Sequence, residues 1–243
     1  MTLPKTETIP DDPESLPPAR RRRARRLLAP FDPDERSTYI DDLAYRTSPT
    51  FDFFLFSLVS GIILSIALVL DAPAFLLLGA LFAPFMGPVM GIALGTVVGS
   101  VKFFIRSVGG LVVGFLLVFG SGAVVGYLSS YLDVGGLYQA YLGAQLNWAN
   151  FLLLVVTSLI ATAALANTRH RPGLMSAARV ASVGMAYQFF VPLAAAGFGL
   201  GAGEPHLFPD GLVVLAVHLT WTILFCSMAL AVLGCRPLTL FGY

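Results

Sequence analysis

The residues whose types and spacing promise chemistry are three prolines and two polar side chains inside long apolar runs. Pro84 and Pro88 interrupt one run, and Pro192 follows Gln188 by four residues in another. A proline has no N–H, so the carbonyl four residues before it loses its helical partner. In hydrocarbon such a carbonyl costs several kcal/mol unless protein or water satisfies it. Freed carbonyls attract cations or donor groups, and half-helix N-termini attract anions.

These groups predict a substrate site for a small solute or ion near the middle of a membrane. His218 is the one ionisable side chain well inside an apolar run. The residues expected to form the site are Ala80, Pro84, Gly87, Pro88, Tyr187, Gln188, Pro192 and His218. Two alternatives stay open: a kinked packing helix whose freed groups are satisfied by its neighbours, and a His218 that only bonds a neighbouring helix.

We expect no enzyme activity, because no nucleophile–base pair, Walker loop, dinucleotide fingerprint or HExxH motif occurs. We also expect no cofactor and no metal, since Cys226 and Cys235 have no disulfide or metal spacing and His170 and His206 fall on opposite sides. No Asp, Glu, Lys or Arg lies in the middle of an apolar run, which argues against a proton-driven pump.

The elements that must position these residues are six apolar runs, each near the ~20 residues that span a bilayer. They cover about 53–70, 74–100, 103–128, 148–166, 174–199 and 211–234. The chain is 56% hydrophobic and 12% charged, far from the composition of a soluble domain. We predict an all-α polytopic membrane protein with six transmembrane helices, and a transmembrane domain over residues 53–236.

The six runs fall into two groups of three, about 53–128 and 148–234. GPVMGIALG (87–95) and VPLAAAGFGLG (191–201) share a proline and a glycine-rich continuation. Because each group has an odd number of spans, the second must be inverted relative to the first. The pattern therefore predicts two inverted repeats with proline-broken helices two and five.

Residues 1–52 are predicted to be a cytoplasmic, largely disordered tail with a short helix from Asp32-Pro33 to about Arg46. Tyr39, Ile40 and Leu43 would share one side of that helix. All fifteen Lys and Arg fall on one side of a six-span arrangement, which places both termini in the cytoplasm. The tail arginines Arg20, Arg21, Arg22, Arg23, Arg25 and Arg26 are either a topology signal or a site for lipid head groups. We expect no nucleic-acid binding, because acidic residues surround this cluster.

Small residues recur at every fourth position through 79–99 and again in the third run. This spacing is typical of helices that approach closely, within a subunit or between subunits, so we expect a homo-oligomer. As a membrane protein, the chain is also expected to contact membrane lipids. The glycines assigned to helix packing are Gly91, Gly95, Gly99, Gly110, Gly114, Gly122 and Gly126.

The stretch LDAPAFLLLGALFAPFMGPVMGIALG (70–95) resembles the core motif of a prokaryotic membrane family, domain of unknown function 389. The matching residues are Asp71, Gly79, Ala80, Ala83, Pro84, Met86, Gly87, Pro88 and Gly91. The chain departs from the family at two places. It has Val191-Pro192 where the family usually has a double proline, and Trp221 follows Thr220 where the family often has an asparagine. The resemblance implies a multi-span protein of the prokaryotic plasma membrane and supplies no activity.

We therefore expect a transporter or channel for a small solute or ion, with a midplane site at the broken helices. The alternative is a non-transporting membrane scaffold or lipid-binding protein, which the glycine seams and the arginine-rich tail favour.

Overall fold

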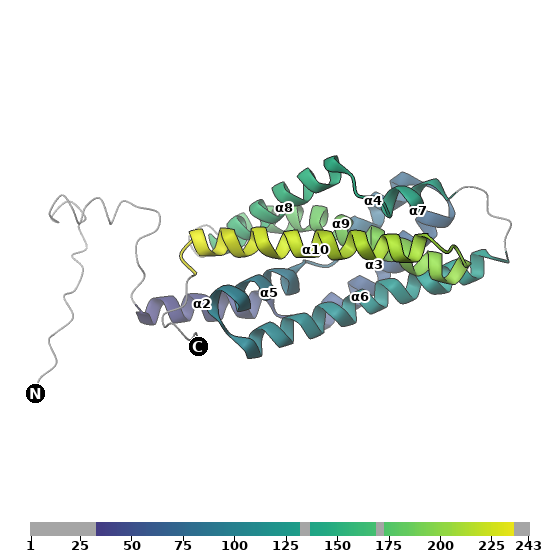
Figure 1. The fold of residues 1–243 in the computed structure, drawn as a ribbon. Helices are drawn as coiled ribbons and strands as arrows, with labels where there is room; N and C mark the ends of the chain where they lie inside the picture. The colour runs from purple at the N-terminus through teal and green to yellow at the C-terminus, as the bar shows by residue number, and fades with distance from the viewer. Residues whose placement is uncertain (1–32, 132–136, 169–172, 236–243) are drawn as a thin grey trace, which may run out of the picture.

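The computed structural model describes residues 33–131, 137–168 and 173–235, and this part of the chain is a bundle of helices without strands (Figure 1). The helices are α2 (Pro33–Thr47), α3 (Phe51–Val69), α4 (Pro73–Leu81), α5 (Gly87–Val98), α6 (Val101–Ser129), α7 (Tyr138–Gly143), α8 (Trp148–Ala166), α9 (Leu174–Ala202) and α10 (Leu207–Val232). Five segments are long and apolar enough to cross a membrane: Thr38–Val69, which contains α3, and the helices α6, α8, α9 and α10. The chain is thus an all-helical, multi-pass membrane protein.

The second apolar run forms two short helices, α4 and α5, with a break at 82–86. Ala83 precedes Pro84, and a residue before proline is pushed out of the helical conformation. Gly87 and Pro88 then start α5, where a proline in the first turn loses no helical bond. The predicted interruption of this run is therefore present, and its local cause is the first of the two prolines.

Helices α3 and α6 run parallel to each other. Pro49, just before α3, packs on Gly110 of α6, and Gly61 packs on Val118 further along both helices. The chain must therefore return between them from the end of α3 to the start of α6. Helices α4 and α5 make that return, with α4 near the end where α3 finishes and α5 near the end where α6 begins (Figure 1).

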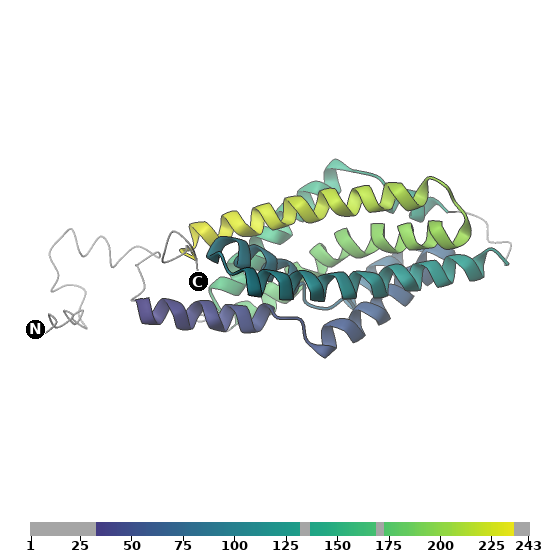
Figure 2. The ribbon, with the colours of Figure 1, turned by 60° about the horizontal axis from the view of Figure 1, so that its bottom comes forward.

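Helix α9 lies at the centre of the bundle, in contact with α3, α4, α6, α7, α8 and α10. Figure 2 shows α6 and α10 running the length of the molecule on either side of it. Pro192 lies inside this helix, which continues unbroken from Leu174 to Ala202. The prediction that Pro192 breaks the fifth span is wrong. The carbonyl that it frees, that of Gln188, lies 3.0 Å from Nδ1 of His218, so the helix has no need to unwind.

Glycines bring α6 and α9 into backbone contact. A Cβ added at Gly122 would lie 2.5 Å from the carbonyl oxygen of Ala194, and one at Gly126 would strike the carbonyl of Phe198. From the other side, Gly197 and Gly201 of α9 meet the backbone of α6 in the same way. Small residues four apart on both helices allow this approach. This glycine seam lies within one subunit, and association between copies stays a prediction.

The predicted tail helix is confirmed as α2, which starts at Pro33 and ends at Thr47. Tyr39, Ile40 and Leu43 are all buried on one side of it. The Tyr39 hydroxyl donates to the carbonyl of Ala166, at the end of α8, over 2.7 Å. Helix α2 therefore packs into the bundle, mainly against α5. The six-arginine cluster lies outside the described residues.

Candidate binding site

The short helix α7 reaches from one end of the bundle toward its middle. At its start, the backbone N–H of Gln139 donates to a carboxylate oxygen of Asp71, over 2.7 Å, in the turn between α3 and α4. At its end, a Cβ on Gly143 would lie 2.7 Å from Cγ1 of Val191, near the middle of α9. Helix α7 and the start of α8 therefore wall off a space beside the centre of α9.

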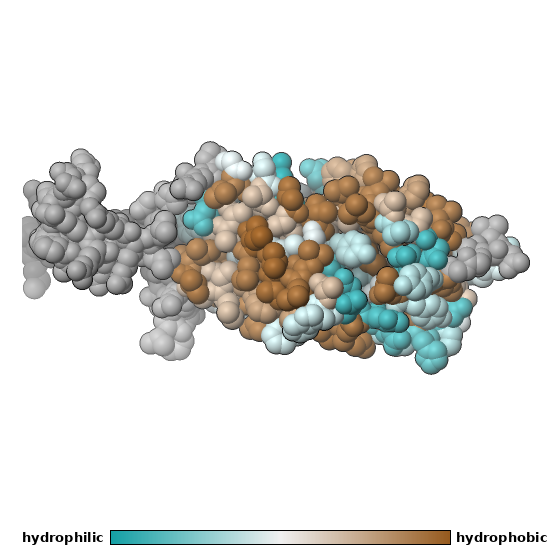
Figure 3. Space-filling view, turned by 90° about the horizontal axis from the view of Figure 1, so that it is seen from above, coloured by the Kyte–Doolittle hydropathy of each residue, from teal (hydrophilic) through white to brown (hydrophobic). Residues whose placement is uncertain are grey.

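That space is a cavity of about 90 Å³. It is lined by Leu76 of α4, by Gln139, Leu142 and Gly143 of α7, by Asn147 and Asn150, by Tyr187, Gln188, Val191 and Pro192 of α9, and by His218 of α10. Asn147 is exposed as well as lining the cavity, so the cavity reaches the surface at this residue. Seen from above, hydrophilic residues gather over the region that holds α7 and the start of α8 (Figure 3).

Two polar side chains stand out in the cavity wall. Gln188 is the middle residue of α9, His218 lies near the middle of α10, and each is only 2% exposed. The backbone carbonyl of Gln188 accepts a hydrogen bond from Nδ1 of His218. Among the buried side chains that the structure describes, Nε2 of Gln188 and Nε2 of His218 are the only nitrogen atoms without a partner. A buried polar group left unpaired costs about 1–3 kcal/mol, so a donor or acceptor from a bound solute or a water would stabilise this pair.

The structure brings together four of the eight residues expected at the site: Tyr187, Gln188, Pro192 and His218. Of the other four, Ala80, Gly87 and Pro88 are buried and do not line this cavity. The carbonyl of Ala80 accepts from the N–H of Ala83 in the turn that ends α4, over 3.1 Å, so the expectation that it is free is wrong.

Pro84 lines a different, wider groove of about 440 Å³, together with Ser182 and other residues of α4, α9 and the break itself. The hydroxyl of Ser182 accepts the N–H of Met86, over 2.7 Å, and so satisfies a donor at the start of α5. Ser182 and Pro192 are ten residues apart on α9, or about 15 Å. The two proline sites thus meet the same helix at different depths and line separate spaces.

A comparison with family models matches residues 80–224 to the Domain of unknown function (DUF389) family. The chain belongs to the DUF389 family. The matched region contains the α4–α5 break and most of the cavity lining, including Gln188 and His218, so the candidate site lies within the part that defines a DUF389 protein. No curated protein and no solved structure matches the chain significantly.

Three polar residues of this DUF389 site are absent from the sequence-based expectation: Gln139, Asn147 and Asn150. Two of them flank Trp148, so an asparagine inside the first turn of an apolar run was the available signal. Ser182 was also missed, because nothing local relates it to Met86, 96 residues earlier.

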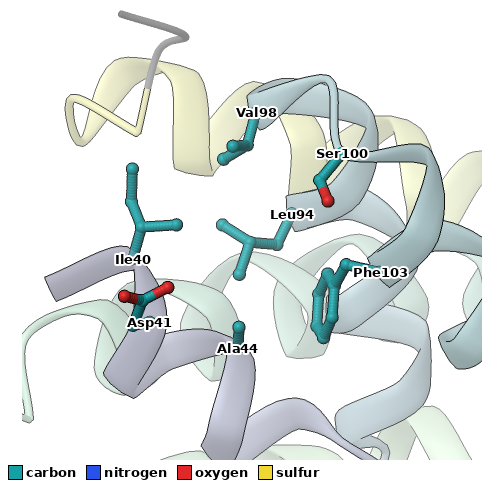
Figure 4. A pocket seen from close by; sticks show the side chains of 7 residues that line it. All are labelled: Ile40, Asp41, Ala44, Leu94, Val98, Ser100 and Phe103. Carbon is teal, nitrogen blue, oxygen red and sulfur yellow. The ribbon is translucent and has the colours of Figure 1, made fainter. Parts of the chain in front are cut away.

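A third space lies between α2, α5 and the start of α6, with a volume of about 320 Å³. Ile40, Leu94 and Phe103 face one another across it, and Asp41 and Ser100 supply the polar atoms of its rim (Figure 4). None of the buried atoms without a partner belongs to its lining. Its chemistry is that of a packing groove, in contrast to the cavity at Gln188.

Proposed function

We propose that this DUF389 protein is a transporter or channel for a small solute or ion, which binds in the cavity between α7, α9 and α10. The observation that carries the proposal is the pair of buried, unpartnered nitrogens on Gln188 and His218. Both residues sit at the middle of helices long enough to cross a membrane, and their cavity reaches the surface at Asn147. Binding sites at the bilayer midplane between helices are typical of membrane transporters.

We further propose that the chain crosses the membrane six times, with α4 and α5 together as the second crossing. Their nine and twelve residues amount to about 31 Å of helix before the break is counted, near the ~30 Å thickness of the hydrocarbon. The parallel packing of α3 and α6 supports this, because only a return passage between them lets both run in one direction.

The two groups of three crossings carry matching local structure, which supports the inverted repeat. Helices α5 and α9 both end at a glycine with positive φ: Gly99 at 80° and Gly203 at 79°, 104 positions apart. In each case the next N–H donates to a glycine carbonyl one turn back, Ser100 to Gly95 over 3.0 Å and Glu204 to Gly199 over 2.9 Å. Helices α3 and α8, which open the two groups, each have 19 residues.

The helix before each group also packs in an equivalent place. Helix α2 lies on α5, with the carbonyl of Thr47 beside Gly87, and α7 lies on α9, with Gly143 beside Val191. Gly87 and Val191 each precede a proline, Pro88 and Pro192, and are themselves 104 positions apart. This is what two inverted copies of one unit would produce.

The charges support an orientation with both termini in the cytoplasm of a prokaryotic cell, and the protein in its inner membrane. Lys102 and Arg106 open α6, and Arg179 lies in the first turns of α9, at the end of the bundle that also holds α2. The turns at the opposite end carry Asp71 and Glu204. Basic residues mark the cytoplasmic side of membrane proteins.

Flux through proteoliposomes tests the proposed function. The full chain is reconstituted and offered a panel of neutral solutes and of monovalent ions, with empty liposomes as the baseline. We expect flux of at least one probe, reduced by Gln188→Met, which removes the amide at similar volume. Gln145→Met is the matched control, because Gln145 is exposed and does not line the cavity. Flux of no probe would favour the scaffold or lipid-binding alternative, and equal flux in both variants would show that the transported probe does not bind at Gln188.

A further inference from the structure

We infer that the solute is a small neutral molecule with both a hydrogen-bond donor and an acceptor, and that the cavity discriminates against ions. This inference rests on the proposed function and specifies the substrate class of the same site. It follows from the charge of the lining, from the state of the backbone groups that prolines and helix ends expose, and from the tautomer of His218.

The polar side chains of the cavity wall are all uncharged. They are the carboxamides of Gln139, Asn147, Asn150 and Gln188, the phenol of Tyr187 and the imidazole of His218. No Asp, Glu, Lys or Arg is among the residues that line the cavity. An ion moved from water into such a site loses its hydration without gaining a counter-charge, which is expensive. A neutral solute exchanges its hydrogen bonds with water for hydrogen bonds with the amides.

Three of the backbone groups that prolines and helix ends expose are already engaged. A cation needs oxygen ligands, and the backbone carbonyl that Pro192 frees, on Gln188, already accepts from His218, which leaves it only the neutral carboxamide oxygens of the wall. The Ala80 carbonyl is taken by the N–H of Ala83. An anion needs N–H groups, and at the start of α5 the N–H of Met86 is held by Ser182. The proline sites therefore offer an ion fewer free backbone carbonyl and N–H groups than the sequence suggests.

The hydrogen bond to Gln188 sets the chemistry of the other His218 nitrogen. A carbonyl oxygen can only accept, so Nδ1 of His218 carries the proton, and Nε2 of the neutral ring is left as an acceptor. The unpartnered Nε2 of Gln188 is a donor. A complementary solute thus gives an N–H or O–H to His218 and accepts from Gln188. The cavity of about 90 Å³ has room for a small solute.

Selectivity in proteoliposomes tests the inference. Urea, formamide and glycerol serve as neutral probes, followed by light scattering, and potassium and chloride serve as ionic probes, followed by ion-selective dyes. We expect faster entry of at least one neutral probe than into empty liposomes, and no increase for either ion. Passage of an ion without any neutral probe would overturn the inference and leave the proposed function standing. Passage of none of the five would overturn both.

Two variants of His218 separate its two nitrogens. His218→Asn retains an N–H near the Nδ1 position, which can still donate to Gln188, but removes the acceptor at Nε2. His218→Gln places its amide further out, near the position of Nε2, and loses the bond to the Gln188 carbonyl. We expect His218→Asn to fold with the stability of the parent and to lower neutral-solute flux about tenfold, the effect of one hydrogen bond of about 1.4 kcal/mol.

Thr220→Val is the matched control, because Thr220 is exposed on the same helix and does not line the cavity. It should leave the flux unchanged. Unchanged flux in a folded His218→Asn variant would overturn the role of Nε2 as an acceptor. If only His218→Gln lost flux, and in proportion to lost stability, His218 would be a packing residue and the inference would fail.

Discussion

The two proline-bearing segments, α4–α5 and α9, form the most informative comparison in the molecule. The spacing of 104 positions that relates Gly99 to Gly203 also relates Pro88 to Pro192. At the same spacing, Pro84 corresponds to Gln188. Both segments thus contain one proline at an equivalent place, and they differ in the residue four positions before it.

At this position the two segments have opposite structures. Where the residue is Pro84, the helix ends, and the Ser182 hydroxyl of α9 accepts the N–H of Met86, where the next helix begins. Where it is Gln188, the helix continues, and the one freed carbonyl is satisfied by His218 from α10. One proline can be absorbed by a neighbouring side chain, whereas two prolines four residues apart remove two donors and restrict two preceding residues. The unbroken helix carries a polar side chain, Gln188, at its middle.

Gln188→Pro should have the largest effect, because it makes α9 resemble the broken α4–α5 segment. A proline at 188 removes another helical donor and clashes with the carbonyl of Gly184, which costs about 3 kcal/mol or more. Thermal unfolding of the purified protein in detergent measures the loss. Gln188→Ala is the control for the side chain alone, and the comparison fails if both variants unfold at the same temperature.

His218→Leu should destabilise by about 2–3 kcal/mol, because it leaves the Gln188 carbonyl buried without a donor. Pro192→Ala restores an N–H at 192 that can bond the same carbonyl. In that background the cost of His218→Leu should fall by about 1 kcal/mol. A double-mutant cycle of unfolding free energies measures this coupling. An equal cost in both backgrounds would show that His218 does not replace the donor that the proline removes.

Ser182→Ala should destabilise by about 1–2 kcal/mol, because the N–H of Met86 loses its buried acceptor. The effect should be local to the broken α4–α5 segment. Hydrogen exchange should rise at residues 82–90 and stay unchanged at residues 186–192. Ser176→Ala, at the exposed start of α9, should remain within about 0.5 kcal/mol of the parent. Faster exchange at both proline sites would mean that the two are not separately supported.

Tyr141→Phe should have the smallest effect and concerns only the α9 end of the comparison. The Tyr141 hydroxyl donates to Glu204, beside the terminal Gly203, over 2.8 Å. This bond, then burial and the charge of Glu204, raises the pKa of Tyr141 above its ordinary value of 10.0. A pKa raised by folding means that the interaction stabilises the fold at pH values below 10.0. This stabilisation is lost as the pH rises through the raised pKa of the folded protein.

The substitution should therefore lower stability by at most about 0.5 kcal/mol at pH 7, because the pair is exposed. The difference between the two proteins should disappear at strongly alkaline pH. Unfolding curves at pH 7 and pH 11 measure it. A difference that grows with pH would contradict this sign.

Much of the fold was predictable from local patterns. The apolar runs predict the long helices, and α8 covers the predicted residues 148–166. The spacing of Tyr39, Ile40 and Leu43 predicts the buried side of α2. The break at Pro84 followed from the missing N–H and the restriction on the preceding residue. Half of the expected site residues were found together, because Gln188, Pro192 and His218 are conspicuous in apolar surroundings. These successes share a cause, since each depends on residues within a few positions of one another.

An apolar, all-helical chain with prolines in two of its runs can be predicted from residues alone, because hydropathy and missing donors are properties of single residues and short segments. What those prolines do depends on contacts between helices. Whether a freed carbonyl or N–H stays available depends on which side chain reaches it, and Ser182 and His218 come from other helices. The amides of Asn147 and Asn150 likewise became part of a site only because α7 and α8 fold against the middle of α9.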